Sequence, residues 1–537
     1  MSLRKKWNAA FRWLGQSFGA QIFLLFVFVL IAKGHPIPEP ITEYLYLPRM
    51  MKQYNPNYVP NDWTLASPAQ EHLVFNTTFG WLGKYISMET VGWLGRILAW
   101  LLAFVALLRL GQRLKLPPWL TSMAIFFWLL REQSIVASEW AIGGFEAKVI
   151  SYLFLFFSLD LFLGKRRRWG AFLLGLSFSF HPAVGLSAGL AVGFALLFFR
   201  LSLGKLLVLA ICVILGALPG LVPTLTLLSQ KSINADGVWE FVCLVQANQH
   251  LDPWSWPLRE RFLVYATFLF NALHFRVFYK NKAVRFLLLF QVALALFFTL
   301  GLWWRAQEAY HLLRYFPFRL FPLFVLLCFF LQVAVAYHRR KKKSLGNFAM
   351  IVGVVCLMSM GNPLAKFIDF TNQTRALWKP KKDNLTLAFT WVRKNTPKTS
   401  VIIMPPWEGR TFHLVQRPQI ANWWANRYDK LSEWKQRLEA MVGKIPAAST
   451  EEKLQLMDKR YNSRTPEQIR SIMKKYGGDY LVSKGFYPYP VVFRTPTYRV
   501  YHLKLPKAPL RRRKAPAQQP KTHVKQPKAP TSAPAKR

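Results

Sequence analysis

The sequence has few acidic residues and few cysteines. Only 25 Asp and Glu residues stand against 71 Lys and Arg in a chain of 537 residues, which gives a formal net charge of +46. The four cysteines are scattered and make no C-x-x-C spacing, so they indicate neither a disulfide framework nor a zinc site. The excess of positive charge predicts an anionic partner. We expect membrane lipids in this role and no nucleic acid.

Charged residues are also scarce inside the apolar runs. Hydrophobic residues make up 53% of the chain and charged residues 18%, and the apolar residues are concentrated in runs such as 18–32, 91–108 and 206–228. A soluble core does not need such runs, so we expect an α-helical polytopic membrane protein. A coupled transporter should carry ionisable groups in mid-span, and their shortage disfavours one.

On the length that a helix needs to cross a bilayer, the sequence predicts about eleven spans. One long run breaks at His181-Pro182, because proline removes a backbone donor and disfavours helix in the residue before it. The expected spans cover 18–32, 91–110, 118–130, 149–163, two parts of 169–199, 206–228, 262–275, 284–304, 320–337 and 348–360. The short clusters of Lys and Arg then fall on one side, which the positive-inside rule makes cytoplasmic together with the N-terminus.

Three regions follow from this pattern. Residues 1–365 form the transmembrane helical domain, with a long first outer loop at 33–90. Residues 380–505 alternate helical and strand patterns and predict a small soluble α/β domain on the outer side. Residues 506–537 are rich in Pro, Ala and Lys and contain no acidic residue, so we expect a disordered basic tail.

Acidic residues in the outer loops are the candidate catalytic groups. Asp62 lies in the sequence Asn61-Asp62-Trp63 of the first loop, and an N-cap or a solvated loop acid is an equal interpretation. Glu139 and Glu146 flank Gly143-Gly144, close to Lys148 at the entrance of a span. An ion pair between Glu146 and Lys148 that anchors the helix is the alternative to a catalytic role.

Basic residues of the later outer loops are candidates for phosphate binding. Arg314 and Arg319 carry planar guanidinium groups that suit bidentate contacts with phosphate, although ordinary anionic headgroups would also suit them. His250 precedes Asp252-Pro253 and is able to bind metal or phosphate. We expect His181, at the helix break, to have a structural role, and His72 is a weaker candidate than Asp62.

The order of these features resembles the GT-C class of membrane glycosyltransferases, and more closely the uncharacterised bacterial membrane proteins built on that plan. The loop at Gln249-His250 lacks the paired histidines of these relatives. The matching features are the long first loop with Asn61-Asp62-Trp63, Phe145-Glu146-Ala147-Lys148, Phe180-His181-Pro182, His250-Leu251-Asp252-Pro253, Pro317-Phe318-Arg319 and Trp391-Val392-Arg393-Lys394-Asn395-Thr396-Pro397.

The resemblance implies an inverting transfer of a sugar from a polyprenyl-phosphate donor to a glycan or lipid acceptor at the outer face of a bacterial inner membrane. Asp62 would then act as the base or as a ligand of a divalent cation, with Glu139 or Glu146 assisting. The phosphate would lie near Lys148, His250, Arg314 and Arg319. A divalent cation is the one cofactor that the resemblance leaves open, and its ligands are unknown.

Two other functions stay open at this point. A non-catalytic scaffold that binds lipids or envelope polymers would use the aromatic outer domain and the basic tail. A lipid transporter or flippase needs mainly a hydrophilic groove. Trp407, Trp423 and Trp424 of the outer domain could stack on sugar rings, and core packing is an equal interpretation of them.

Overall fold

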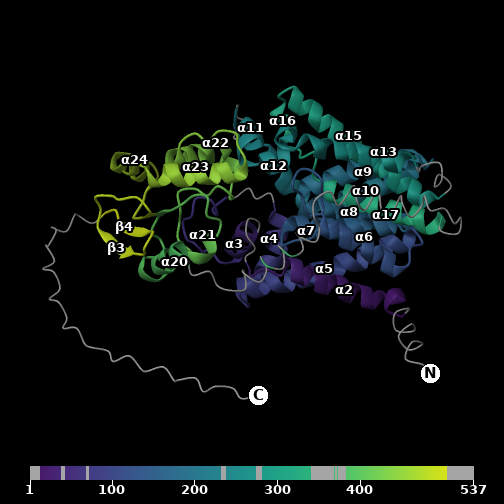
Figure 1. Cartoon of the computed structure of the whole chain (residues 1–537), viewed down its shortest axis with the longest axis horizontal. Coiled ribbons are helices and arrows are strands. Elements are labelled where there is room, and N and C mark those ends of the chain that lie inside the picture. Colours follow the sequence, from purple (N-terminus) through teal and green to yellow (C-terminus); the bar gives the residue numbers. More distant parts are fainter. Residues whose placement is uncertain are drawn as a thin grey trace, which may run out of the picture.

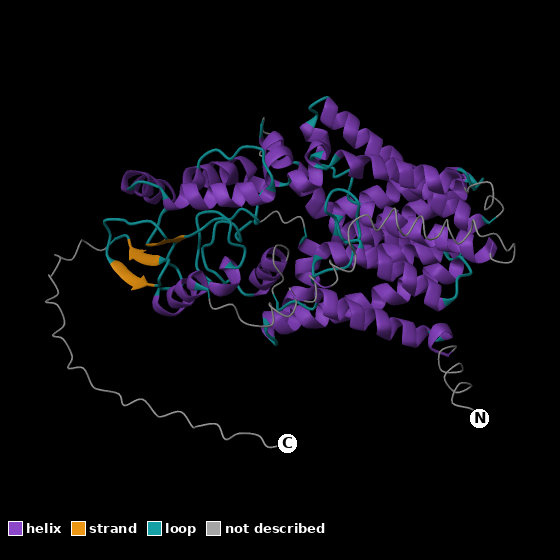
Figure 2. Ribbon diagram, viewed as in Figure 1, coloured by secondary structure: helices purple, strands orange, loops and turns teal. Residues whose placement is uncertain are grey.

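The structure is a computed structural model that describes residues 13–37, 43–67, 72–230, 237–273, 281–339, 368, 372 and 383–504. A bundle of helices occupies one end of the molecule and a smaller domain the other (Figure 1). The described strands all lie in the smaller domain (Figure 2). The expected span 348–360, most of the basic run 339–343 and the basic tail lie outside the described residues.

The helices of the bundle coincide with the predicted apolar runs. They are α2 (Phe18–Lys33), α5 (Met88–Arg113), α6 (Pro118–Leu130), α7 (Ala147–Leu163), α8 (Arg167–Phe180), α9 (Pro182–Leu197), α10 (Leu203–Leu228), α13 (Leu258–Leu273), α15 (Lys282–Ala306) and α17 (Phe321–Arg339). Three of them, α5, α10 and α15, are long and apolar enough to cross a membrane. The protein is therefore an integral membrane protein, and the number of eleven spans is not confirmed.

Short elements connect these helices. We call the end of the bundle that meets the C-terminal domain the proximal end, and the end with loops 164–166 and 198–202 and the start of α15 the distal end. The connecting elements are α3 (Glu43–Tyr54), α4 (Leu73–Gly80), η1 (Trp81–Lys84), α11 (Val238–Phe241), the π-helix η3 (Val242–Gln246), α12 (Asn248–Leu251), η4 (Pro253–Ser255) and α16 (Tyr310–Leu313). The first outer loop is therefore partly helical.

Two glycines bring the backbones of α8 and α10 together. A Cβ atom on Gly175 would lie 2.1 Å from the Val213 carbonyl oxygen, and one on Gly216 would lie 2.1 Å from the Phe172 carbonyl oxygen. Because neither backbone can give way, only glycine fits at these two positions. Most of α10 otherwise faces outward, since only 22% of its most apolar window is buried.

The C-terminal domain combines helices with a four-stranded sheet, which confirms the predicted small sheet domain. The strand order is β1-β2-β4-β3, with β1 parallel to β2 and with β4 antiparallel to both β2 and β3. Leu481 of β2 faces Tyr501 of β4 in this register. The elements are α20 (Asn384–Asn395), β1 (Ile402–Ile403), α21 (Thr411–Leu414), η6 (Tyr428–Lys430), α22 (Leu431–Val442), α23 (Thr450–Asn462), α24 (Pro466–Tyr476), β2 (Tyr480–Ser483), β3 (Val491–Arg494) and β4 (Arg499–His502).

Three tryptophans of this domain, Trp407, Trp423 and Trp424, pack in or against its core. Trp423 is 2% exposed and packs edge-on against Phe241, with ring centroids 6.2 Å apart. Trp424 donates from Nε1 to the Trp407 carbonyl at 2.6 Å, and the Trp407 ring meets Tyr461 edge-on. Core packing was one of the two interpretations of the sequence, and it describes these contacts.

The first loop is bound to the C-terminal domain by buried polar contacts. Arg49 of α3 donates to the Asn426 carbonyl at 2.6 Å, and Arg427 donates to the Trp63 carbonyl at 2.5 Å. Ser67 donates to Asp429 at 2.8 Å. Because the partners are backbone carbonyls and buried side chains, these bonds fix the orientation of the domain on the proximal end of the bundle.

A buried ion pair ties this loop to the bundle. Arg96 of α5 contacts both carboxylate oxygens of Glu43, at 2.7 Å from Nε and 2.5 Å from Nη2, and neither side chain is exposed. A third nitrogen of Arg96 donates to the His35 carbonyl at 2.5 Å. The backbone N–H of Phe145 donates to Glu43 at 2.6 Å. The pair therefore holds α3, α5 and the entrance of α7 at one point.

Removing one partner of this pair should destabilise the protein strongly. Arg96→Met leaves an uncompensated carboxylate in the interior, so we expect a loss of about 3–5 kcal/mol in the free energy of unfolding. The double variant Arg96→Met/Glu43→Gln should recover part of that loss. Thermal denaturation of the purified protein in detergent measures both.

The matched control is Arg470→Met, because Arg470 and Glu467 form a pair whose side chains are 59% and 69% exposed. It should change the free energy of unfolding by less than about 1 kcal/mol. Equal thermal midpoints for Arg96→Met and Arg470→Met would show that the buried pair does not hold the proximal end together.

Candidate functional site

The loop between α6 and α7 is built on a strained backbone. Four of its non-glycine residues have left-handed φ angles: Glu132 at 60°, Gln133 at 70°, Ala137 at 63° and Ser138 at 46°. The Gln133 side chain holds the loop, because its Oε1 accepts from the backbone of Ala141 and of residue 142 at 2.8 Å. Such strain persists only where the surroundings fix it, and it is concentrated at functional sites. Here it immediately precedes Glu139.

Glu139 is the centre of a cluster of three basic side chains. Arg319 donates to its Oε1 at 2.6 Å, and the Lys148 ammonium lies 3.2 Å from its Oε2. The His250 ring lies 3.3 Å from Oε1 and also contacts the Ala137 carbonyl at 2.7 Å. The side chain of Glu139 is 1% exposed and that of His250 is 19% exposed, so His250 forms the rim of the cluster. We call these four residues the Glu139 cluster.

Trp140 connects the cluster to the second carboxylate. Its Nε1 donates to Glu146 Oε1 at 2.6 Å, and the Lys148 ammonium lies 3.3 Å from the centre of its ring. A cation this close to the indole face is stabilised by the ring quadrupole. The indole therefore fixes both Glu146 and Lys148, and no direct contact between those two side chains is needed to anchor the helix.

The two carboxylates have opposite protonation properties. Burial alone would raise the pKa of Glu139, but Arg319, Lys148 and His250 outweigh it and hold that pKa well below its usual range. Burial raises the pKa of Glu146, and Lys148 with the indole hydrogen bond opposes this only in part. Glu139 is therefore a fixed negative charge, whereas Glu146 is the group suited to exchange a proton. Pairs of acids separated in this way divide the roles in acid–base catalysis.

Two histidines lie beside the cluster. His181 at the start of α9 and His72 at the start of α4 have ring centroids 5.0 Å apart, and the Tyr46 hydroxyl lies 3.1 Å from His72 Nε2. Nδ1 of His181 accepts from the Val184 amide at 3.4 Å, so the neutral ring carries its proton on Nε2. Sequence reasoning gave both histidines little weight. The Phe180-His181-Pro182 break was the available signal, because it places an imidazole at a helix start.

Asp62 lies away from this cluster, at the junction with the C-terminal domain. It is fully buried, and its two oxygens accept from the amides of Leu65 at 2.8 Å and Gln419 at 3.0 Å. This is the turn-capping geometry that was the alternative to a catalytic role. Burial raises the pKa of Asp62 to about 6, although the backbone hydrogen bonds oppose the shift.

The remaining candidate residues lie outside the Glu139 cluster. Arg314 lies against Tyr315, with its guanidinium 5.1 Å from the ring centre and one nitrogen 3.1 Å from the hydroxyl. Asp252 pairs with Arg305 at 2.7 Å. Among the residues that the structure describes, no group of three or more His, Cys, Asp and Glu side chains is arranged to hold a metal ion.

Comparison with known proteins gives a match to one family model and similarity to solved structures, two of which are described here. Residues 384–441, from α20 through α22, match the family described as "Domain of unknown function (DUF6798)". No curated protein matches the chain. The chain is similar to the crystal structure of the Archaeoglobus fulgidus oligosaccharyltransferase in the apo form, with a TM-score of 0.47 and 12% identity over 87% of this chain and 69% of that one.

The second structure is the same archaeal enzyme tethered through a disulfide bond to an acceptor peptide containing the NVT sequon. Its TM-score is 0.48, with 11% identity over 88% of this chain and 70% of that one. At such identity and TM-score no residue, substrate or activity is carried over from that enzyme to this chain.

The raised pKa of Asp62 predicts a dependence of stability on pH. Between about pH 4 and pH 6 the folded protein binds more protons at this position than the unfolded chain, so the free energy of unfolding falls as the pH rises. The fall from this group is about 3 kcal/mol, and it is complete above about pH 6. Asp62→Asn lacks this titration. The thermal midpoint of Asp62→Asn in detergent should therefore rise relative to that of the unmodified protein from pH 4 to pH 6.

The comparison of the two proteins at each pH is the control, because every other titrating group is common to both. A midpoint difference that stays constant from pH 4 to pH 7 would show that Asp62 is ionised in the folded protein throughout this range.

Proposed function

We propose that this protein is a membrane glycosyltransferase that transfers a sugar from a polyprenyl-phosphate donor to a glycan or lipid acceptor at the proximal end of the bundle. The observation that carries the proposal is the Glu139 cluster. It places buried cations, a fixed negative charge and a second acid of raised pKa together at the entrance of α7. A donor with a phosphate leaving group needs these components.

Arg319 and Lys148 would stabilise the phosphate as negative charge builds on it. Arg319 contacts Glu139 through one terminal nitrogen, and its buried Nε has no hydrogen-bond partner. An unpaired buried donor is costly, and a phosphate oxygen would satisfy it. In this role Glu139 keeps two cations in place before the substrate arrives, which is the preorganisation that electrostatic catalysis requires.

Glu146 would take the proton of the acceptor hydroxyl. The acceptor oxygen attacks the anomeric carbon and forms the new glycosidic bond, while the bond from that carbon to the phosphate oxygen breaks. The electron pair of the broken bond stays on the phosphate, and the proton goes to Glu146. A carboxylate whose pKa is raised by burial is a better base than an ordinary one.

Asp62 is the base that the sequence favours, and we assign proton transfer to Glu146 in its place. Both oxygens of Asp62 already accept backbone hydrogen bonds, and one of these bonds joins the first loop to the C-terminal domain. A group used in this way holds the first loop against the C-terminal domain. His250, at the rim, is the member of the cluster best placed to meet a substrate first.

The orientation in the membrane belongs to the same proposal. Cations gather at the distal end, at Lys115, in the segment 165–168 and at Lys282. The positive-inside rule makes this end cytoplasmic, so the proximal end and the C-terminal domain face outward. A lipid-linked donor anchored in the outer leaflet of a bacterial inner membrane would then reach the Glu139 cluster with its phosphate at interface depth.

A non-catalytic lipid-binding scaffold is the second candidate. The observation in its favour is that the basic side chains of the cluster already pair with Glu139 and are at most 19% exposed. Such a site could hold a lipid phosphate without turnover. The two functions differ in whether label moves from the donor to an acceptor.

Transfer should depend on Glu146. We expect Glu146→Gln to lower kcat by about 10²- to 10⁴-fold, because the amide keeps the bond from Trp140 but cannot take a proton. The assay offers radiolabelled polyprenyl-phosphate sugars to the purified protein in lipid, with and without a divalent cation. Glu132→Gln is the control, because Glu132 is an exposed acid of the same loop.

Asp62→Asn belongs in the same assay. Transfer that stops in Asp62→Asn and continues in Glu146→Gln would return the role of the base to Asp62. Binding of the labelled lipid with no transfer in the unmodified protein would favour the scaffold.

The transfer assay should also distinguish Arg319 from Arg314, which the sequence analysis gives the same phosphate-binding role. Arg319→Gln removes a donor from the developing phosphate charge, and we expect about a 10²- to 10³-fold lower kcat. Arg314→Gln should leave transfer within about 3-fold of the unmodified protein, because Arg314 lies against Tyr315. Equal losses in the two variants would place the phosphate elsewhere. Arg319→Lys, which keeps the charge but loses the planar fork, separates charge from geometry.

A further inference from the structure

Two cavities lie at the distal end of the bundle, opposite the Glu139 cluster. The first, of about 330 Å³, lies between the end of α7, the end of α9 and the start of α15. The second, of about 690 Å³, lies between the start of α8 and the start of α10. Lys165 and Arg167 line both cavities, so the two adjoin at the loop between α7 and α8.

The charged side chains described around these two cavities are all basic. Their walls carry Lys165, Arg166, Arg167, Arg168, Lys205 and Lys282, and among the residues that the structure describes no acidic one lines either cavity. Asp160, one turn before the end of α7, is already bound by Arg109 at 2.8 Å and by Arg113 at 2.7 Å. Cations gathered in this way repel one another, so an anion from outside the chain would be strongly favoured here.

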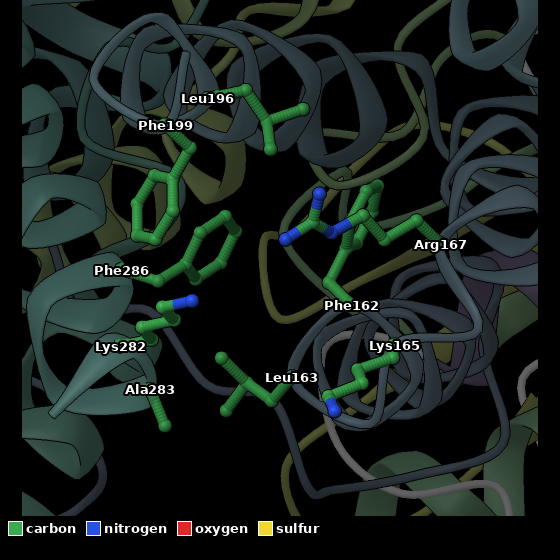
Figure 3. Close-up of a pocket in the computed structure, with 9 residues that line it drawn as sticks. All are labelled: Phe162, Leu163, Lys165, Arg167, Leu196, Phe199, Lys282, Ala283 and Phe286. Carbon is green, nitrogen blue, oxygen red and sulfur yellow. The ribbon is translucent and has the colours of Figure 1, made fainter. Parts of the chain in front are cut away.

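The cations are aimed at a common space. Figure 3 shows the Arg167 guanidinium and the Lys282 ammonium pointing into the first cavity from opposite walls. The floor between them is aromatic, since the rings of Phe162 and Phe199 each lie 6.0 Å from the ring of Phe286. A group that binds here therefore needs a small anionic part and tolerance for an apolar surface.

The second cavity continues onto the outward face of α10. Val208 and Leu209 form part of its wall, and on the same helix Leu207 is 55% exposed and Ile211 is 54% exposed. Trp169 at the mouth is 65% exposed, and an exposed tryptophan beside basic residues is typical of the depth where headgroups meet acyl chains. The same site thus offers a cationic pocket and an apolar track.

Two helices also begin at this region without a side-chain cap. Arg166 precedes α8 and Ser202 precedes α10, and neither side chain accepts a hydrogen bond from the helix. Their first backbone amides are therefore available to a bound anion. Ser17, which precedes α2, does cap its helix through the Ala20 amide.

We propose that the distal end holds a specific binding site for an anionic glycerophospholipid. The headgroup phosphate lies between Arg167 and Lys282, with Lys165 and the start of α8 around it, and an acyl chain follows the exposed face of α10. The positive charge of the cavities favours a lipid with net negative charge over a zwitterionic lipid. The exposed apolar face of α10 favours a lipid over free phosphate. This site is independent of the proposed transfer reaction.

The test measures lipid binding to the full-length protein. Delipidated protein in detergent is titrated with phosphatidylglycerol, with phosphatidylcholine of the same acyl chains, and with inorganic phosphate, and bound species are counted by native mass spectrometry. The variant Arg167→Gln/Lys282→Gln removes the two opposed cations. The matched control Lys115→Gln/Arg200→Gln removes the same charge from exposed residues of the same end that line neither cavity.

We expect phosphatidylglycerol to bind the unmodified protein at least about 10-fold more tightly than phosphatidylcholine, and the cavity variant to lose about 30-fold. The control should lose less than about 3-fold. Equal losses in both variants would show attraction by net charge alone and overturn the site. Displacement of the lipid by millimolar inorganic phosphate would also overturn it, in favour of a site for free phosphate.

Lys282→Gln alone is the second variant, since Lys282 is an exposed residue at the start of α15 whose change leaves packing intact. It should lose about 5-fold in affinity for phosphatidylglycerol at an unchanged thermal midpoint without lipid. An unchanged affinity would contradict the proposed position of the phosphate. Transfer activity is not read in this experiment, so its outcome is separate from that of the proposed function.

Discussion

The buried pair between Glu43 and Arg96 is the constraint on which the proximal end depends. A carboxylate and a guanidinium can leave water together only if almost all of their hydrogen-bonding capacity is used, and here it is used by the His35 carbonyl and the Phe145 amide. The amide belongs to the residue before Glu146. The ion pair thus connects the first loop, α5 and the start of α7, and it sets the position from which the candidate site is built.

The site shows how one loop gives two similar side chains different properties. Glu139 and Glu146 are both buried, yet their pKa values move in opposite directions because only Glu139 contacts Arg319. The difference depends on the tertiary fold, because Arg319 lies just before α17, 180 residues further along the chain than Glu139. Trp140 then keeps the two carboxylates in fixed relation through a hydrogen bond to one and a cation–π contact with Lys148.

Much of the helical layout could be predicted, and the pairing of distant side chains could not. Long apolar runs and the His181-Pro182 break have local physical causes, so the sequence locates the helices and the break. Helix α23 and strand β3 have weaker patterns: α23 is largely polar and is marked mainly by the capping box of Ser449 and Glu452, and β3 is a half-exposed edge strand. The contact of His72 with His181 and the hydrogen bond between Gln419 and Asp62 depend on tertiary packing. The periodicity of apolar residues does not predict such long-range contacts.

The contact between the C-terminal domain and the first loop has a consequence for biosynthesis. Asp62 bonds to Gln419 across 357 residues of sequence, and Arg49 bonds to residue 426 across 377. At about 5–20 residues per second, the ribosome needs roughly 20–70 s to make the chain between such partners. Throughout that time Asp62 and Arg49 lack their contacts with the C-terminal domain. Docking of this domain on the first loop is therefore a late event in synthesis, governed by the closing of a very long chain segment rather than by local helix formation.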